Sequence, residues 1–276
     1  MGATAEIHPT AVVDPQAVLG PGTRIGAFSI IGHQVTIGPE AEIGHHVVLE
    51  GRVIVGPRAR IGHGSVLGGI PQDLKFKRGT PSGVRIGAGT TIREYVTIHR
   101  ATQPETWTEI GDDCLLMAMC HIAHDCRVGN HVIVINYAGL TGHTEVEDHA
   151  TVGGLTGVAP FVRIGAFAYI GGCSKVTADV PPYMLADGAP ATARGVNVIG
   201  LRRSGMRAAE RRLLQEAYRI LYRSALAPAR AVETIRATLP ATAALSHLVE
   251  FVAGARRGIC GPLRRRTEPD RGEPVF

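Results

Sequence analysis

Aromatic side chains are scarce in this chain, which has only 6 Phe, 6 Tyr and 1 Trp in 276 residues. Hydrophobic residues nevertheless make up 45% of the sequence, and glycine alone occurs 35 times. Small and β-branched side chains must therefore fill most of the interior. This composition excludes a core built around large aromatic rings and favours a narrow core of aliphatic side chains.

Several features of membrane and secreted proteins are also missing. No apolar run approaches the roughly 20 residues that a membrane-spanning helix needs, so we expect no membrane span. The number of cysteines, 5, is odd, and Met1 leads into repeat sequence without a basic and then apolar leader. These features favour a soluble protein in a reducing cytoplasm.

The formal net charge of +5 favours acidic partners, such as phosphorylated small molecules, an acidic carrier protein or nucleic acid. A solvated basic surface without a partner explains the charge equally well. Because aromatic residues are sparse and no nucleic-acid-binding motif is present, the sequence predicts no nucleic-acid partner.

An aliphatic residue recurs every six positions over three stretches, Ile7 to Leu67, Ile86 to Ile98 and Ile110 to Val176. The residue two positions earlier is nearly always small or β-branched. Alternate residues of a strand point the same way, so both positions face inward. Glycine often follows the aliphatic residue, where the chain turns a corner. Three such hexads form one triangular coil, and we expect a mainly β fold, a parallel β-helix over residues 1–186.

Two interruptions of the repeat, residues 69–85 and 100–109, are expected to bulge outward as loops. Long loops on a rigid repeat scaffold are common places for function.

The period changes after Pro181-Pro182, and apolar residues then recur at helical spacing. Helices are predicted over 206–223, 228–239 and 242–256, with Gly258 and Gly261 as stop signals. We expect a C-terminal α-helical domain over 187–261 that caps the prism, followed by a disordered tail over 262–276.

Half of the 12 histidines lie within a short stretch of the repeat. Because one coil has three hexads, His124 and His143 lie on successive coils and are predicted to share a site. A neutral imidazole oriented by Asp125 suits removal of a proton from an alcohol. Three histidines could instead hold a catalytic zinc ion. The clustered histidines are His99, His121, His124, His131, His143 and His149.

Other motifs contribute less. Cys114, Cys120 and Cys126 fall in the inward phase of the repeat and are interpreted as core residues rather than ligands. The Gly153-Gly154 and Gly171-Gly172 pairs are not phosphate loops, because no helix follows them. Arg202 and Arg203, at the junction with the helical region, could bind a diphosphate, although a solvated basic surface is the alternative.

Seven segments, in order over about 200 residues, closely resemble the UDP-N-acetylglucosamine O-acyltransferases that begin lipid A synthesis. They are Pro71 to Lys75, Ile92 to Arg100, His121 to Cys126, Ala138 to His143, Gly171 to Ser174, Asp179 to Tyr183 and Gly195 to Arg203. Resemblance to the wider class of hexapeptide-repeat proteins implies that the β-helix is left-handed, an exception to the usual right-handed crossover.

The resemblance implies transfer of an R-3-hydroxyacyl chain from acyl carrier protein to the sugar 3-hydroxyl, in a homotrimer with sites between neighbouring prisms. It makes His124 the general base, Asp125 its partner and the Gly142 amide the oxyanion donor, with no metal and no cofactor. The remaining implied roles concern the substrates. Asp73 and His143 would contact the sugar, Gln72 the acyl β-hydroxyl, and Asn197 with Arg203 the nucleotide; Gly172 would set acyl length, and Lys75, His99, His121 and Arg202 would line the cleft or receive the carrier.

Three positions depart from the family pattern, at Ala159-Pro160, Ala189-Pro190 and Ile199, all around the acceptor and acyl groove. Two alternatives therefore stay open. One is a related acyltransferase that acts on another UDP-sugar, including a 3-amino sugar or the N-acyl step of the same pathway. The other is a zinc hydratase on the same scaffold, a class that lacks the Gln72-Asp73 loop and the Asn197 to Arg203 segment.

Overall fold

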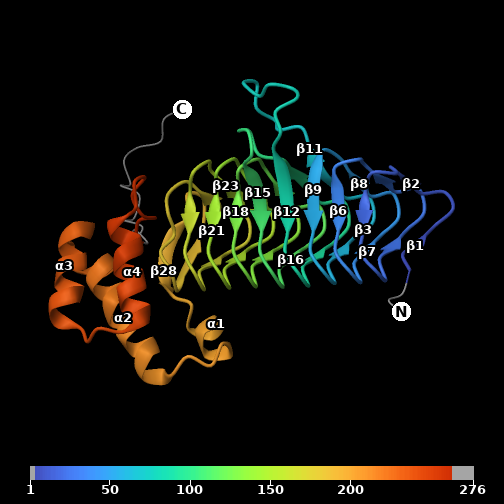
Figure 1. Cartoon of the computed structure of the whole chain (residues 1–276). Helices are drawn as coiled ribbons and strands as arrows, with labels where there is room; N and C mark the ends of the chain where they lie inside the picture. Colours follow the sequence, from blue (N-terminus) through green and yellow to red (C-terminus); the bar gives the residue numbers. More distant parts are fainter. Residues whose placement is uncertain (1–3, 263–276) are drawn as a thin grey trace, which may run out of the picture.

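The computed structural model describes residues 4–262, and within them three parallel sheets form the faces of a long triangular prism (Figure 1). Up to β26, each strand pairs with the strand three places along the chain, so three consecutive strands complete one coil. The interior contains the predicted aliphatic columns. Its largest fully buried side chains are all Ile, Leu or Met. The predicted parallel β-helix is thus confirmed.

The strands fall into three sheets. The 11-stranded sheet contains β1 (Glu6–Ile7), β4 (Arg24–Ile25), β7 (Glu42–Ile43), β10 (Arg60–Ile61), β13 (Thr91–Ile92), β16 (Leu115–Leu116), β19 (Ile133–Val134), β22 (Thr151–Val152), β25 (Tyr169–Ile170), β27 (Met184–Asp187) and β28 (Thr192–Val196). The 9-stranded sheet contains β2 (Val12–Val13), β5 (Ile30–Ile31), β8 (Val48–Leu49), β11 (Val66–Gly69), β14 (Thr97–His99), β17 (His121–Ile122), β20 (Gly139–Leu140), β23 (Gly157–Val158) and β26 (Lys175–Val176). The 8-stranded sheet contains β3 (Val18–Leu19), β6 (Val35–Ile37), β9 (Arg52–Val55), β12 (Gly83–Ile86), β15 (Trp107–Ile110), β18 (Arg127–Val128), β21 (Glu145–Val146) and β24 (Arg163–Ile164).

The chain passes from sheet to sheet at three corners. The first corner joins the 11-stranded to the 9-stranded sheet, the second joins the 9-stranded to the 8-stranded sheet, and the third returns to the 11-stranded sheet. Most turns place one residue in the left-handed region, including Asp125 (φ 58°) and His143 (φ 61°) at the second corner. Side chains at equivalent turn positions therefore stack in a column along each corner.

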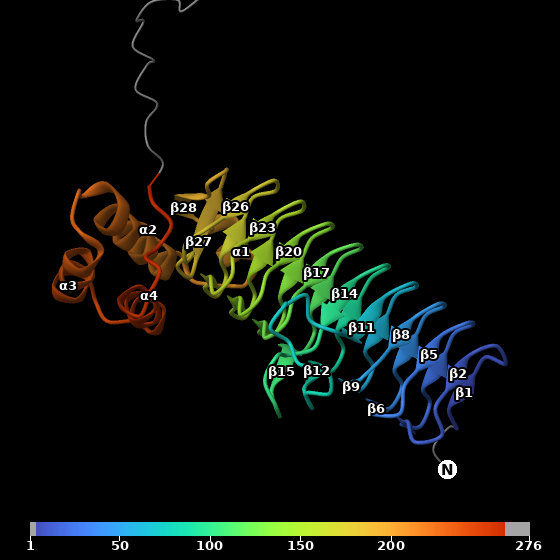
Figure 2. The same ribbon diagram turned by 90° about the horizontal axis from the view of Figure 1, so that it is seen from above.

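Both interruptions of the repeat replace turns of the second corner. The first excursion, residues 70–82, runs from β11 to β12, and the second, residues 100–106, runs from β14 to β15 (Figures 1 and 2). They are shorter than the predicted loops 69–85 and 100–109. The reason is that Gly83–Ile86 forms a strand that pairs with both Arg52–Val55 and Trp107–Ile110.

The C-terminal region contains helices α1 (Val198–Arg203), α2 (Ala208–Arg223), α3 (Pro228–Thr238) and α4 (Ala243–Ala253). Helices α2, α3 and α4 agree with the prediction, except that α4 ends at Ala253 with Gly254 as its cap, before the predicted end at residue 256. Helix α1 and the antiparallel β27–β28 pair were not expected. The division after residue 186 stays a prediction. Of the predicted disordered tail over 262–276, Pro262 is described and forms a β-bridge with Ala193, and the rest lies outside the described residues.

Two groups of contacts dock the helices on the end of the prism. The Arg163 guanidinium stacks on the Phe251 ring at 4.0 Å and donates a hydrogen bond to the Gly254 carbonyl at 3.2 Å. His247 of α4 lies 2.9 Å from a Glu147 carboxylate oxygen and 3.1 Å from the Tyr183 hydroxyl. The helical region is therefore attached through specific polar contacts as well as apolar ones.

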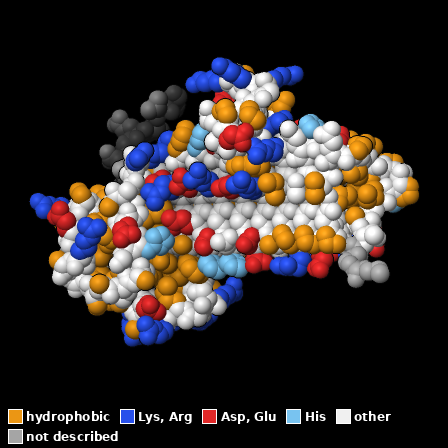
Figure 3. All heavy atoms as spheres, in the orientation of Figure 1, with side chains coloured by type: hydrophobic (Ala, Val, Ile, Leu, Met, Phe, Trp, Pro, Cys, Tyr) orange, Lys and Arg blue, Asp and Glu red, His pale blue; other side chains and the backbone are white. Residues whose placement is uncertain are grey.

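Charged side chains of alternating sign form a row across the 8-stranded sheet (Figure 3). Within this row, Arg85 pairs with Glu109 at 3.1 Å and Arg163 with Glu145 at 3.8 Å. Exposed pairs of this kind contribute little stability individually. No helix among residues 4–262 is long and apolar enough to cross a membrane.

Candidate active site

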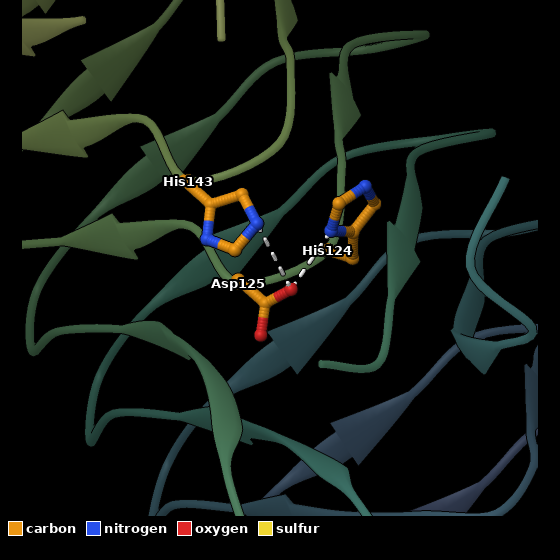
Figure 4. A group of neighbouring side chains, drawn as sticks. All are labelled: His124, Asp125 and His143. Carbon is orange, nitrogen blue, oxygen red and sulfur yellow. Dashed lines mark hydrogen bonds and ion pairs between the residues drawn. The ribbon is translucent and has the colours of Figure 1, made fainter. Parts of the chain in front are cut away.

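The second corner brings together His124, Asp125 and His143, as predicted from their spacing (Figure 4). His124 lies in the turn that follows strand β17, and Asp125 is the next residue of that turn. His143 occupies the position of Asp125 in the turn one coil further on. Oδ2 of Asp125 lies 2.8 Å from Nδ1 of His124 and 3.6 Å from Nε2 of His143. One carboxylate oxygen thus faces two imidazoles.

The hydrogen bond to Asp125 defines the tautomer of His124. An ionised carboxylate only accepts hydrogen bonds, so Nδ1 of His124 must carry the proton. In neutral His124 the lone pair is therefore on Nε2, away from Asp125. This is the arrangement that a general base requires.

Asp125 is held by further donors from the second excursion. Its Oδ2 accepts a hydrogen bond from the Thr102 hydroxyl at 2.7 Å, and its Oδ1 accepts one from the Thr102 backbone amide at 3.1 Å. Burial acts to raise the pKa of Asp125, but the hydrogen bonds from His124 and Thr102 and the charge of His143 together hold that pKa below its ordinary value. Asp125 therefore stays ionised near neutral pH.

Gly142 lies directly against the ring of His124, one coil further along the corner. A Cβ atom at this position would lie 2.5 Å from Cε1 and 2.8 Å from Nε2 of His124. The Gly142 carbonyl accepts a hydrogen bond from the Phe161 amide, but its own amide donates to no other described residue. Residue 142 must therefore be a glycine for the His124 ring to lie where it does. The Gly142 amide is available to a ligand.

His99 and His121 lie on the neighbouring strands β14 and β17 of the 9-stranded sheet, with their ring centroids 4.8 Å apart. Burial, followed by the charges of His121 and His124, lowers the pKa of His99 to about 4. Burial, followed by the charge of His124, also lowers the pKa of His121. Both rings are therefore neutral at neutral pH, next to the predicted base.

The first excursion contains three more predicted residues, Gln72, Asp73 and Lys75. Asp73 stabilises a tight turn, because its carboxylate accepts a hydrogen bond from the Lys75 amide at 2.9 Å. Gln72 and Lys75 are exposed. The excursion emerges from the same corner as His124, two coils earlier, and its basic residues form part of the projection at the top of Figure 3.

The other predicted residues lie at different corners of the same chain. Gly172 belongs to the turn between β25 and β26, at the first corner. Arg202 and Arg203 belong to α1 and Asn197 precedes it. The helix is tied to the third corner because the Asn197 side-chain amide donates to the Phe167 carbonyl at 2.9 Å. Asn197 also caps α1 by accepting from the Gly200 amide. Within one chain, then, these residues do not meet His124.

The three side chains around Asp125 also have the composition of a metal site. Among residues 4–262, His124, Asp125 and His143 form the one group of three or more His, Cys, Asp or Glu residues whose ligand atoms lie within 4.8 Å of one another. A metal ion there would replace the proton that His124 shares with Asp125. The cysteines Cys114, Cys120 and Cys126 are buried in the core and take no part.

Sequence reasoning missed Thr102 and Phe161. Thr102 lies in an interruption of the repeat, where the sequence favours function, but no repeat relates its position to Asp125. The ring of Phe161 stacks on His143 with 4.5 Å between ring centroids. It occupies the turn position one coil beyond His143, so the coil length could have revealed this contact.

Comparisons with known proteins find relatives over most of the chain. A family profile described as UDP-N-acetylglucosamine O-acyltransferase, domain 2, matches residues 179–260, and a bacterial transferase hexapeptide profile matches residues 34–69 and 108–142. A relative from Burkholderia mallei named acyl-[acyl-carrier-protein]–UDP-N-acetylglucosamine O-acyltransferase is 48% identical over 92% of this chain and 99% of its own length. A relative of the same name from Thermodesulfovibrio yellowstonii is 45% identical over the same shares.

The solved structure of the UDP-N-acetylglucosamine acyltransferase from Francisella novicida superimposes with a TM-score of 0.90 and 34% identity, covering 94% of this chain and 95% of that one. The left-handed sense of the β-helix, expected from the resemblance, is thereby confirmed. The chain belongs to the family of acyl-[acyl-carrier-protein]–UDP-N-acetylglucosamine O-acyltransferases.

Proposed function

We propose that this protein transfers an R-3-hydroxyacyl chain from acyl carrier protein to the 3-hydroxyl of UDP-N-acetylglucosamine, the first step of lipid A biosynthesis. The names of the relatives contain the donor and the acceptor. The observation that carries the proposal is the hydrogen bond between His124 and Asp125. It leaves Nε2 of His124 next to Gly142.

In the proposed reaction, Nε2 of His124 removes the proton from the sugar 3-hydroxyl while that oxygen attacks the thioester carbonyl carbon. The new C–O bond forms as the carbonyl π electrons move onto its oxygen. When the tetrahedral intermediate collapses, the C–S bond breaks and the carrier thiolate takes the proton from the His124 imidazolium. His124 is thus regenerated, and no cofactor is consumed.

Asp125 and Gly142 stabilise the two charges that develop. The Asp125 carboxylate, 2.8 Å from Nδ1, stabilises the imidazolium that forms on His124. The Gly142 amide, which has no acceptor among the described residues, would donate to the oxyanion. His143, whose Nε2 is 3.6 Å from Asp125, lies beside the base and would contact the sugar with Asp73.

Substrate binding requires a second copy of the chain in this proposal. Helix α1 is at the third corner, whereas His124 and the first excursion are at the second. In a homotrimer with parallel prisms, α1 of one copy can approach the second corner of the next. Asn197 and Arg203 would then hold the nucleotide. Gly172 would set acyl length, and its lack of a side chain would leave room for a longer chain.

The remaining residues would serve the acyl carrier protein and the cleft. Gln72 would contact the acyl β-hydroxyl, while Lys75, His99, His121 and Arg202 would line the cleft or receive the acidic carrier. The neutral state of His99 and His121 suits an uncharged wall beside the acyl chain. We place the reaction in the cytoplasm and expect no nucleic-acid partner.

The test is to incubate the purified protein with R-3-hydroxyacyl carrier proteins of graded chain length and several UDP-sugars, and to identify products by mass spectrometry. We expect a 3-O-acyl product with UDP-N-acetylglucosamine. If that sugar yields no product with any donor, the proposal is wrong. Product formed only from a 3-amino sugar would support the related acyltransferase instead.

A metal-dependent reaction is the alternative that the His124, Asp125 and His143 geometry allows. Measurement of bound zinc and assays in the presence of a chelator separate the two. We expect full transferase activity in chelator, whereas loss of activity that zinc restores would favour the metal.

A further inference from the structure

We propose that Thr102 is a positioning residue for the reaction, because it directs the Asp125 carboxylate toward His124 and away from His143. This inference rests on the proposed function, in which His124 is the base. Thr102 belongs to the second excursion and is contributed to the site by a segment outside the hexapeptide repeat.

The Asp125 carboxylate has a choice between two histidines. Its Oδ2 is 2.8 Å from Nδ1 of His124 and 3.6 Å from Nε2 of His143, and the two rings are nearly perpendicular. A rotation about the Asp125 side-chain bonds would bring the oxygen closer to His143 (Figure 4). His124 would then lose the partner that defines its tautomer.

Thr102 opposes this rotation with two donors. Its hydroxyl donates to Oδ2 at 2.7 Å, and its backbone amide donates to Oδ1 at 3.1 Å and to Oδ2 at 3.3 Å. The Asp125 backbone is also fixed, because its amide donates to the buried Thr108 hydroxyl at 2.8 Å. With both carboxylate oxygens engaged on one side, Asp125 has one favoured orientation.

The position of Thr102 depends on contacts of the second excursion with strand β12 and with the first excursion. The Ala101 amide donates to the Gly83 carbonyl at 3.3 Å, and the Glu105 amide donates to the Pro81 carbonyl at 2.9 Å. At its far end the second excursion leads into Trp107, whose ring is contacted by the guanidinium groups of Arg52 at 4.6 Å and Arg85 at 4.1 Å. Thr102 is therefore held by a rigid loop base, as orientation of a charged partner requires.

The test compares three variants of the same loop. Thr102→Val removes the hydroxyl but keeps the shape and the backbone amide, and Thr102→Ser keeps a hydroxyl. The matched control is Thr106→Val, because the exposed Thr106 donates only to the Gln103 carbonyl within its own turn. Circular dichroism and melting temperatures verify folding, and Thr102→Ala repeats the measurement if Thr102→Val melts early.

We expect Thr102→Val to lower kcat about tenfold, which corresponds to about 1.4 kcal/mol, with KM for both substrates changing less than twofold. The acidic limb of the pH–rate profile should move to lower pH, because an Asp125 carboxylate turned toward His143 stabilises the His124 imidazolium less strongly. Thr102→Ser and Thr106→Val should behave like the unmodified protein.

Unchanged kcat and pH profile in Thr102→Val would overturn the inference. So would a Thr102→Ser variant as impaired as Thr102→Val, or an equal loss in Thr106→Val. An unmodified protein that forms no product would instead refute the proposed function, so the two failures are distinguishable.

Discussion

The second and third corners of the prism use histidine in opposite ways, although the same turn builds both. At the third corner, His131 and His149 are exposed and stack in parallel, with ring centroids 4.7 Å apart and 9° between the planes. At the second corner, the rings of His124 and His143 are 5.3 Å apart and nearly perpendicular, at 87°. The Asp125 carboxylate faces both of these rings.

This difference teaches that coil spacing alone brings side chains together without making a reactive site. The third-corner column continues from His149 to Phe167 at 4.5 Å and on to Tyr183, and so reaches the helical region. It is a structural stack. At the second corner the two excursions and the Asp125 carboxylate interrupt the stack. Asp125 then orients the His124 imidazole by a hydrogen bond.

The largest expected effect is from His124→Ala, compared with His131→Ala. We expect His124→Ala to lower kcat by at least about 100-fold, because the general base is lost. His131→Ala should leave kcat within about twofold of the unmodified protein, since a stacked, exposed ring does no chemistry. Initial rates with acyl carrier protein and UDP-N-acetylglucosamine measure both. Similar rates for the two variants would show that the corners do not differ in function.

A smaller effect is expected from Gly142→Ala, compared with Gly157→Ala. A methyl group at residue 142 meets the His124 ring at 2.5 Å, whereas nothing lies within 4 Å of one at residue 157. We expect Gly142→Ala to lower kcat by about 10- to 100-fold through displacement of the base, and Gly157→Ala to have little effect.

Both glycine variants should keep the melting temperature of the unmodified protein to within a few degrees. Full activity of Gly142→Ala would mean that the His124 ring can move without loss, and would contradict the tight contact described above.

The smallest effect concerns stability at the end of the third-corner column. The hydrogen bond from His247 to Glu147 raises the pKa of His247, and the charges of Glu147 and Glu250 raise it further. Burial and the charge of Arg163 lower this pKa, but they do not outweigh the first group. The folded protein therefore binds this proton more tightly than the unfolded chain. The contribution is fully present below the ordinary histidine pKa and is lost as pH rises through the raised value.

His247→Gln should lower the free energy of unfolding by no more than about 1 kcal/mol at about pH 6, because the pair is partly exposed. The loss should shrink at about pH 8.5. Thermal melts at both pH values measure it, and Glu147→Gln should remove the same pH dependence. A loss of stability that is independent of pH would assign His247 a packing role only.

Features with a period were predictable from the sequence. Six-residue spacing identified the inward columns, and coil length placed His124 above His143, a contact now seen around Asp125. The excursions do not follow the period, so nothing in the sequence related Thr102 to Asp125. Helix α1 has only 6 residues and depends on the Asn197 cap, which leaves too short a pattern to detect.

The parallel register of the coils also determines how the chain tolerates insertions and deletions. Because Arg24 pairs with Glu42 and Ile25 with Ile43, deletion of residues 25–42 would join equivalent positions and shorten the prism by one step of about 4.8 Å. Loss of a single hexad there would instead shift every earlier strand to the adjacent face. Whole coils are therefore units that can be gained or lost without disturbing His124, whereas fractions of a coil are not.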